Sequence, residues 1–124
     1  MSIRQSLVAI VDDDESFKNA LHDLIESDGL SALSFDSAEE FLNSDARHRA
    51  DCLIADVRMP GMSGLQLQAK LKAERCPIPI IFITAHADAE TRILALRHGA
   101  VEFLTKPFDD RVLLEVVHAA LGKK

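Results

Sequence analysis

The chain has 124 residues, the size of a single domain, and 48% of them are hydrophobic, which is enough to bury a core. Acidic residues outnumber basic ones by 20 to 14, and the formal net charge of -6 argues against broad binding to nucleic acid or anionic membranes. No apolar run approaches the ~20 residues of a membrane span, and the first residues lack a signal-peptide pattern. We therefore expect one cytoplasmic domain over residues 1–124, with no membrane contact.

The first part of the chain predicts a strand, a helix and a second strand. Residues 7–11, Leu-Val-Ala-Ile-Val, form a continuous apolar run, which is typical of a strand buried on both faces. A helix with one apolar face is expected from about Glu15 to Asp28, and Gly29 is a natural stop for it. A weaker strand pattern follows over residues 30–35.

The next segment leads to a second buried strand. Ser37 and Glu40 predict a capping box that opens a short helix through Leu42. We interpret the polar segment Asn43–Arg49 as a loop. A fully apolar strand is expected over Cys52–Ala55, and a single carboxylate follows it at the next position.

Helix signals then return twice. Ser63 and Gln66 predict a second capping box, and the helix that it opens is stopped by Pro77 and Pro79. The apolar run over Ile80–Thr84 predicts the fourth strand.

The last part repeats the same alternation. The next helix starts at Asp88 or Thr91 and ends at Gly99, and a strand is expected over Val101–Thr105. Asp109 is expected to cap the last helix. Its expected core face consists of Val112, Leu113, Val116, Val117, Ala120 and Leu121.

Five strand–helix units therefore alternate along the chain, joined by short loops. This alternation predicts parallel strands with right-handed helical crossovers. We expect an α/β, flavodoxin-like, doubly wound (βα)5 fold whose five-stranded parallel sheet has the order 2-1-3-4-5. In open α/β sheets the ligand site lies outside the carboxyl ends of the strands, so the residues that follow each strand are the functional candidates.

Polar side chains end the four most apolar strands: Asp12 and Asp13, Asp56, Thr84 and Lys106. In the expected strand order these ends meet in one crevice, and this convergence is a stronger signal than any single residue. The carboxylates would repel one another, because each pair at ~4 Å costs roughly 4 kcal/mol at an effective dielectric of ~20. A divalent cation would relieve the repulsion, and oxygen ligands favour Mg²⁺ or Mn²⁺ over zinc.

Such a crevice fits phosphoryl transfer to Asp56, because a carboxylate can accept a phosphoryl group as an aspartyl-phosphate. The transfer requires in-line positioning and neutralised charge, which the metal and Lys106 would supply. The hydroxyl of Thr84 would hydrogen-bond a phosphoryl oxygen. We therefore predict that Asp56, Lys106 and Thr84 carry the chemistry.

Four motifs, in the right order and spacing, resemble the receiver domain of two-component response regulators. They are Val11-Asp12-Asp13, the segment Asp56-Val57-Arg58-Met59-Pro60-Gly61-Met62-Ser63-Gly64, Thr84-Ala85 and Lys106-Pro107-Phe108. The resemblance covers essentially the whole chain, and the segments around residues 35–41 and 83–88 look most like the FixJ-type group. The Asp pair alone is a weak signal, whereas all four motifs together are highly specific.

The resemblance implies a role for each residue around the metal. Asp13 and Asp56 would bind Mg²⁺ directly, together with the backbone carbonyl of Arg58, and Asp12 would act mostly through a metal-bound water. Arg58 and His86 stand at positions that vary among receivers, and they are expected to tune the lifetime of the phosphate.

The resemblance also implies a switch. Lys106 would pair with the phosphate, and its bond to Pro107 is expected to be cis. Thr84 would move toward the phosphate, and the ring of Phe103 would swing into the vacated space. Many receivers have tyrosine at this position, so the phenylalanine would report through packing alone, and we expect it to be partly buried.

The function implied by the resemblance is a phosphorylation-activated signalling switch whose phosphoryl donor is a sensor histidine kinase. Repacking of the helix over 88–99, the strand over 101–105 and the last helix would control a homodimer or an output domain, most simply one for transcription. DNA would be reached only through an output domain outside this sequence. The alternative is a free-standing receiver, or a phosphotransfer intermediate, without a DNA-binding output.

Two other functions are less well supported by the residues. A phosphatase that works through an aspartyl-phosphate typically has a carboxylate two residues after the nucleophile, where this chain has Arg58. A flavin carrier would need a Ser/Thr/Gly-rich phosphate loop and a Trp or Tyr for stacking, and the chain has neither aromatic residue. We expect no enzyme activity beyond self-phosphorylation and slow autodephosphorylation.

Overall fold

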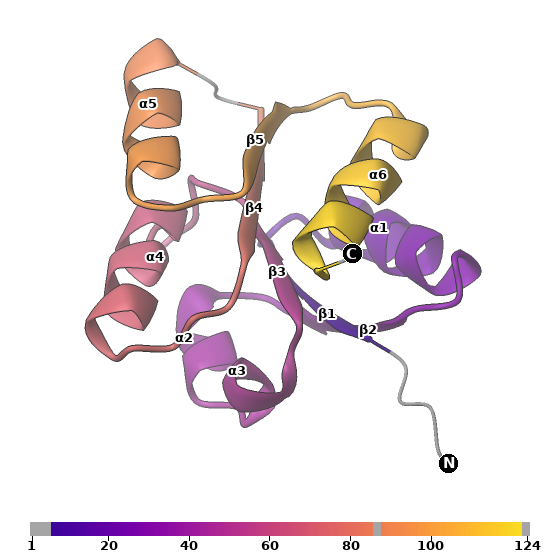
Figure 1. Ribbon diagram of the computed structural model, residues 1–124, viewed down its shortest axis with the longest axis horizontal. Helices are drawn as coiled ribbons and strands as arrows, with labels where there is room; N and C mark the ends of the chain where they lie inside the picture. The colour runs from indigo at the N-terminus through magenta and orange to yellow at the C-terminus, as the bar shows by residue number, and fades with distance from the viewer. Residues whose placement is uncertain (1–5, 86–87, 123–124) are drawn as a thin grey trace.

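The computed structural model describes residues 6–85 and 88–122, which form a central parallel sheet covered by helices (Figure 1). The strands are β1 (Leu7–Val11), β2 (Ser31–Phe35), β3 (Cys52–Ala55), β4 (Ile80–Thr84) and β5 (Glu102–Thr105). The helices are α1 (Glu15–Ser27), α2 (Ala38–Leu42), α3 (Ala46–Arg49), α4 (Gly64–Ala73), α5 (Ala89–Arg97) and α6 (Asp110–Ala120). All strand pairs are parallel and the order is β2-β1-β3-β4-β5, so the predicted flavodoxin-like topology is confirmed.

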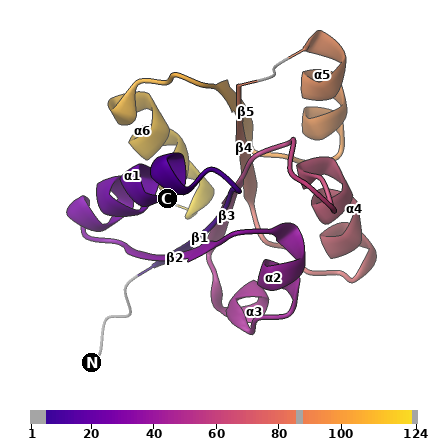
Figure 2. The ribbon, with the colours of Figure 1, turned by 180° about the vertical axis from the view of Figure 1, so that it is seen from behind.

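The helices lie in two layers. Helices α1 and α6 cover one face of the sheet, and α2 to α5 cover the other, as the two opposite views show (Figures 1 and 2). Successive residues of β1 alternate between the layers: Val8 and Ile10 pack toward α1 and α6, whereas Ala9 and Val11 pack toward the other helices. Because both faces are covered, every residue of β1 is buried, as its continuous apolar run predicts.

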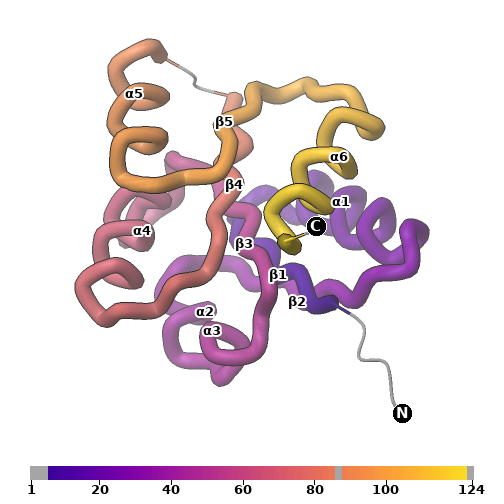
Figure 3. The backbone as a smooth tube through the Cα atoms, viewed as in Figure 1, coloured from indigo at the N-terminus to yellow at the C-terminus, as the bar shows by residue number. Residues whose placement is uncertain are grey.

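Parallel strands with crossover helices bring all the strand ends together at one edge of the sheet. The backbone tube shows β4 and β5 ending at the same edge of the sheet (Figure 3). The register agrees, because the last residue of β4, Thr84, pairs with the last residue of β5, Thr105. The polar residues that follow the strands therefore share this edge.

Side-chain caps fix where several helices begin. The predicted capping box of Ser63 and Gln66 opens α4, with both of its reciprocal hydrogen bonds present. Asp88 starts α5, and its carboxylate accepts the backbone N–H of Thr91 at 2.8 Å, which decides between the two predicted starts. Asp109 caps α6 as predicted.

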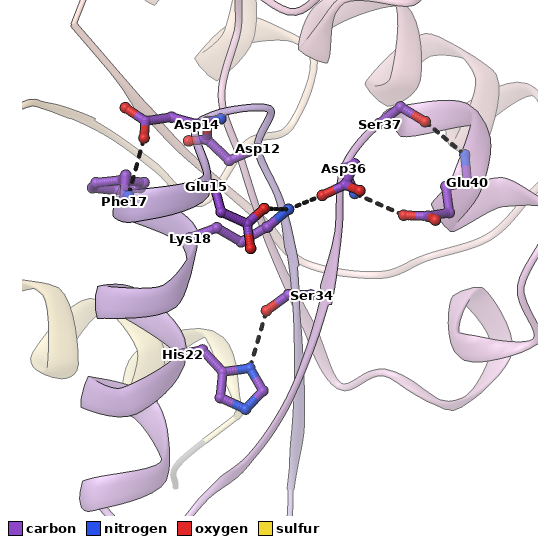
Figure 4. A network of polar contacts seen from close by, with 10 residues as sticks. All are labelled: Asp12, Asp14, Glu15, Phe17, Lys18, His22, Ser34, Asp36, Ser37 and Glu40. Carbon is purple, nitrogen blue, oxygen red and sulfur yellow. Dashed lines mark hydrogen bonds and ion pairs between the residues drawn. The ribbon is translucent and has the colours of Figure 1, made fainter.

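The short helix α2 has only half of its predicted capping box. The Ser37 hydroxyl accepts the backbone N–H of Glu40 at 3.0 Å, but the Glu40 carboxylate accepts the N–H of Asp36 at 2.7 Å (Figure 4). The Glu40 carboxylate thus binds Asp36, the residue before the Ser37 cap. This choice fixes Asp36 directly after β2.

Two sequence predictions about packing are wrong. Residues 43–49 were expected to be a loop, but residues 46–49 form the one-turn helix α3, in which Ala46 is fully buried. A single turn is too short to show helical periodicity, so its apolar anchor is not recognisable in the sequence. Val112 was expected in the core of α6 but is 43% exposed, since Leu113 and Val117 alone reach the fully buried layer.

Among the described residues, no helix is both long enough and apolar enough to cross a bilayer.

Candidate functional site

The carboxylates that follow β1 have three different environments. Asp12 is 2% exposed, and its backbone N–H donates to the carbonyl of Phe35 at 3.2 Å, which continues the β1–β2 pairing. Asp13 is exposed. Asp14 caps α1, where its carboxylate accepts the N–H of Phe17 at 3.1 Å. The run of three acids thus gives a buried carboxylate, an exposed one and a helix cap.

Asp56 lies beside this run because β3 is paired with β1. Its backbone N–H donates to the carbonyl of Val11 at 3.1 Å, one residue before Asp12. The Asp56 side chain is nearly buried, and its Oδ1 accepts the backbone N–H of Arg58 at 3.1 Å. The turn after β3 therefore fixes the carboxylate that the sequence singles out as the phosphoryl acceptor.

Lys106 connects the two strand ends. Its Nζ donates to Asp12 Oδ2 at 3.1 Å and to Asp56 Oδ2 at 3.2 Å. Its backbone N–H donates to the carbonyl of Thr84 at 2.9 Å, which places the lysine at the β4–β5 end of the crevice. The bond from Lys106 to Pro107 is cis, as the resemblance implies. The predicted convergence of Asp12, Asp56 and Lys106 is therefore confirmed.

The donor set fits a hard divalent cation. Asp12, Asp13 and Asp56 each offer a carboxylate oxygen, and these oxygens lie within 4.8 Å of one another. One of the three residues is exposed, so the cluster is open to solvent on that side. Several oxygen ligands with an open, hydrated side are the environment that Mg²⁺ prefers.

Burial and charge act on the pKa values of the cluster. Burial raises the pKa of Asp12, and the backbone N–H of Asp14 and the Lys106 ammonium offset only part of this effect. Burial alone would lower the pKa of Lys106, but its two carboxylate partners together raise it. Lys106 is therefore held as the ammonium ion, the form that can neutralise a phosphoryl group.

The loop after Asp56 depends on two glycines. A Cβ on Gly64 would lie 2.3 Å from the carbonyl oxygen of Asp56 and 2.9 Å from the Phe82 ring, so only glycine fits there. Gly61 has a φ of +76°, which favours glycine, and the carboxylate of Glu39 lies against it. Glu39 also accepts the backbone N–H of Met62 at 3.0 Å, which ties the loop to α2.

The predicted switch residues are both buried. Thr84 has no exposed surface, and Phe103 is only 1% exposed, so the expectation that Phe103 is partly buried is wrong. Its β5 position faces the layer of α4 and α5, where the ring lies 6.3 Å from that of Phe82. Arg92 of α5 donates to the Phe103 carbonyl at 2.9 Å. His86, predicted to tune the phosphate lifetime, lies outside the described residues.

Sequence reasoning missed one neighbour of the site. The Phe17 ring, on the first turn of α1, has its centroid 3.9 Å from the Lys106 Nζ. Its spacing on α1 equally suits a core position, so the sequence offers no signal for this contact.

Comparisons with known proteins show the family of the chain. A model of the response regulator receiver domain family matches residues 8–118. The response regulator protein TodT of Pseudomonas putida is 49% identical over 121 residues, which are 98% of this chain and 53% of that protein. The transcriptional regulatory protein FixJ of Bradyrhizobium diazoefficiens is 36% identical over 114 residues, 92% of this chain and 56% of that protein. The chain thus spans about half the length of these curated relatives.

Solved structures show the same fold. The crystal structure titled FixJ-N is 35% identical, with a TM-score of 0.87 over 98% of both chains. The structure of the response regulator StyR is 42% identical, with a TM-score of 0.88, and covers 95% of this chain and 60% of that one. With a family match over most of its length and these likenesses, the chain belongs to the response regulator receiver domain family and is similar to its FixJ-type members.

Proposed function

We propose that this receiver domain is a signalling switch that accepts a phosphoryl group on Asp56 in a Mg²⁺-dependent reaction. The observation that carries the proposal is the position of Lys106, whose ammonium lies between the carboxylates of Asp12 and Asp56. A fixed cation beside a nearly buried carboxylate is what phosphoryl transfer needs, because the reaction depends mainly on positioning and charge neutralisation.

The acceptor would be the Asp56 carboxylate and the donor a phosphohistidine of a sensor histidine kinase, met in the cytoplasm. An oxygen of Asp56 forms the new bond to phosphorus while the phosphorus–nitrogen bond to the histidine breaks. Lys106 then pairs with the phosphoryl oxygens, and the Thr84 hydroxyl donates a hydrogen bond to one of them. The N–H of Arg58, already bonded to the Asp56 carboxylate, keeps that carboxylate in place.

The metal would be held by the carboxylates of Asp13 and Asp56, by the backbone carbonyl of Arg58 and, through water, by Asp12. When bound, Mg²⁺ neutralises charge on the phosphoryl oxygens. Mn²⁺ has the same ligand preference and is expected to substitute.

We propose a phosphorylated switch and not a phosphatase with turnover. A general acid would be expected two residues after the nucleophile, and the side chain there is the exposed Arg58. The phosphoryl group would leave only by slow autodephosphorylation, at a rate that Arg58 and His86 tune. Both residues are expected to change this rate without changing the ability to accept phosphate.

The output surface would be the face formed by α5, β5 and α6. Four large apolar side chains on or next to these elements are exposed: Ile93 and Leu94 of α5, Val101 just before β5 and Val112 of α6. Phosphorylation would draw Thr84 toward the phosphoryl group and repack this face through the switch pair of Thr84 and Phe103. Because exposed apolar groups mark interaction sites, we propose that the face forms a phosphorylation-dependent homodimer or contacts an output domain.

Transcription is the output that the relatives favour. FixJ is named a transcriptional regulatory protein, and the chain covers only 56% of it. The remaining length of such a relative would hold the domain that contacts DNA. A free-standing receiver or a phosphotransfer intermediate remains the second candidate, and the length of the full gene product distinguishes the two.

The test is phosphorylation by acetyl phosphate with Mg²⁺, followed by intact-mass and peptide mass spectrometry. We expect a gain of one phosphoryl group at Asp56, and no gain in Asp56→Asn or when a chelator replaces Mg²⁺. Asp36→Asn is the matched control, because Asp36 also follows a strand and contacts a lysine but lies outside the proposed site. A labelled residue other than Asp56, or rapid repeated turnover of small phosphomonoesters, would contradict the proposal.

The output face is tested by sedimentation with and without beryllofluoride, a phosphoryl mimic. We expect a higher mass, or altered amide signals over α5, β5 and α6, only when the mimic and Mg²⁺ are both present. Ile93→Asp should abolish the dimer and leave phosphorylation intact. An unchanged mass together with an unchanged α5 region would reject the proposed output face.

A further inference from the structure

We infer that Phe17 is a positioning residue for Lys106: its ring holds the ammonium against Asp12 and Asp56 and so aims it at the phosphoryl group. The contact between the ring and the ammonium exists without a phosphoryl group. Only its effect on phosphorylation rests on the proposed function. The ring centroid lies 3.9 Å from Nζ, well within the ~6 Å at which an ammonium is attracted to an aromatic face.

The ring completes the environment of the ammonium. Two carboxylate oxygens accept from Nζ, at 3.1 Å and 3.2 Å, and an ammonium has three N–H groups. The Phe17 ring is a further close partner and lies on the α1 side. The lysine side chain is 18% exposed, so the protein surrounds most of it. The ring therefore adds a contact to the ammonium that the carboxylates do not supply.

Two contacts hold Phe17 in place, one to its backbone and one to its ring. The backbone N–H of Phe17 donates to the capping carboxylate of Asp14, which sets the residue in the first turn of α1 (Figure 4). The ring packs edge-to-face with Phe108, with centroids 5.8 Å apart and an interplanar angle of 87°. Phe108 belongs to the same loop as Lys106. The ring thus joins α1 to the loop that carries the lysine.

This arrangement gives the third acid of the Asp12–Asp14 run a part in the site. Asp14 does not contact the ammonium in any described interaction, but it caps the helix turn that presents the ring. Charge neutralisation speeds phosphoryl transfer only when the cation is already in position, because a mobile lysine would have to be ordered during the reaction. Phe17 supplies that order before the phosphoryl group arrives.

The contact is tested first in the metal-free protein by NMR. An ammonium held over a ring face experiences a ring current, so we expect the Lys106 ε-CH2 protons to be shifted upfield. The shift should disappear in Phe17→Leu and persist in Phe17→Tyr, which keeps the ring. Phe35→Leu is the matched control, because Phe35 is also half-buried and in an edge-to-face pair, with Phe41.

The consequence is tested by beryllofluoride affinity and by the rate of phosphorylation from acetyl phosphate. For Phe17→Leu we expect both to fall about 3- to 30-fold, the range that a cation–π contact covers. Phe17→Tyr should restore both to near the wild-type values. Mg²⁺ affinity measured alone should stay unchanged, because the ring contacts the ammonium and none of the carboxylates in the described interactions.

The outcomes separate the inference from the proposed function. If wild-type protein with Mg²⁺ accepts neither beryllofluoride nor phosphate, the proposed function fails, while the NMR shift still decides the contact. If wild type is phosphorylated but Phe17→Leu matches it, or Phe17→Tyr is as impaired as Phe17→Leu, the positioning role is wrong. An unshifted Lys106 signal in the wild type also overturns it.

Discussion

Two lysines near the carboxyl edge of the sheet each contact two carboxylates, and the clusters differ in which partner is buried. Lys106 contacts Asp12 and Asp56, whose side chains are 2% and 11% exposed. Lys18 of α1 contacts Glu15 and Asp36, which are both 72% exposed, while the lysine side chain itself is 5% exposed (Figure 4). The same residue types thus form opposite arrangements.

Access to water gives the two clusters different roles. The acids around Lys18 are solvated whether or not the lysine is there, so that cluster serves to join α1 to the segment after β2. The acids around Lys106 are taken from water and repel each other, so they depend on a cation. A site that needs a cation can bind a metal and respond to a phosphoryl group, whereas a solvated cluster has no such need.

The loops that carry the two clusters are also held differently. Asp36 is fixed by side chains, since its N–H donates to Glu40 and its carboxylate contacts Lys18. The loop after Asp56 is fixed by backbone packing, with Gly64 pressed against the Asp56 carbonyl. Glu39 of α2 joins this loop to α2 by accepting the N–H of Met62. Small shifts at Asp56 are therefore harder to absorb than shifts at Asp36.

The largest difference is expected when each lysine becomes methionine, which keeps the stem and removes the charge. Lys106→Met should slow phosphorylation of Asp56 by about 10²- to 10³-fold, the usual effect of removing one fixed group that stabilises developing charge. Lys18→Met should stay within about 2-fold of wild type, since its partners are already solvated. The measurement is the rate of phosphoryl incorporation from acetyl phosphate. Equal losses in the two variants would remove the distinction between the clusters.

A smaller but clear effect is expected at the backbone contact of the site. Gly64→Ala forces a Cβ against the Asp56 carbonyl, and we expect it to lower the free energy of unfolding by about 1–3 kcal/mol and to slow phosphorylation. Gly29→Ala is the control: its φ of +85° also favours glycine, but no atom beyond the adjacent residues lies within 4 Å of the added Cβ. Urea titration measures the stability of both variants. The control should lose stability through backbone strain alone and keep its phosphorylation rate.

The cluster around Lys106 could be predicted from the sequence, whereas the cluster around Lys18 could not. Asp12, Asp56 and Lys106 could be predicted because each directly follows a predicted strand, and parallel topology then brings the strand ends together. Lys18 could not, because a lysine inside an amphipathic helix is normally assigned to the solvated face. Its burial depends on how α1 packs beside β2. Contacts between elements leave no local pattern in the sequence, whereas the ends of strands are marked by the end of an apolar run.

The absence of a local pattern for contacts between elements also explains two details that the sequence did not predict correctly. The contact between Phe17 and Lys106 depends on the distance between α1 and the loop after β5, which periodicity does not encode. The buried Phe103 ring depends on which layer β5 faces, and the partial burial expected for a switch residue overrode the core position that its strand predicts. The inner strands β1, β3 and β4 were predictable because burial on both faces constrains every position, and the edge strands and surface elements were less so.

The stability of the protein, with a chelator present to remove metal, is expected to depend on pH through Asp12. Because burial raises the pKa of Asp12 above its ordinary value of 3.8, the fold binds its proton more tightly than the unfolded chain does. The contribution of Asp12 to stability therefore falls as pH rises through the window above 3.8, and the charged form disfavours folding. Asp12→Asn should raise the free energy of unfolding at pH 7, and this gain should shrink as pH approaches 3.8.

Urea titrations across pH measure this gain, with Asp13→Asn as the control whose carboxylate is exposed and should gain less. Adding Mg²⁺ should stabilise the wild type more than Asp12→Asn, which narrows the difference between them. A loss of stability in Asp12→Asn at pH 7, or a gain that persists unchanged at acid pH, would contradict the account of burial at this site.

The smallest effect is expected for the stability of Lys18→Met. Methionine fills the buried space of the lysine stem, and water solvates Glu15 and Asp36 in place of the ammonium, so the free energy of unfolding should fall by only about 1 kcal/mol or less. Asp36→Asn tests the converse, because it leaves the buried ammonium with Glu15 alone and should cost more than Lys18→Met. Urea titration measures which of the two variants loses more stability, and this order depends only on which partner of the ion pair is buried. If Lys18→Met costs as much as the ~3–5 kcal/mol of a buried charge left unpaired, the acids are not the solvated partners that the structure indicates.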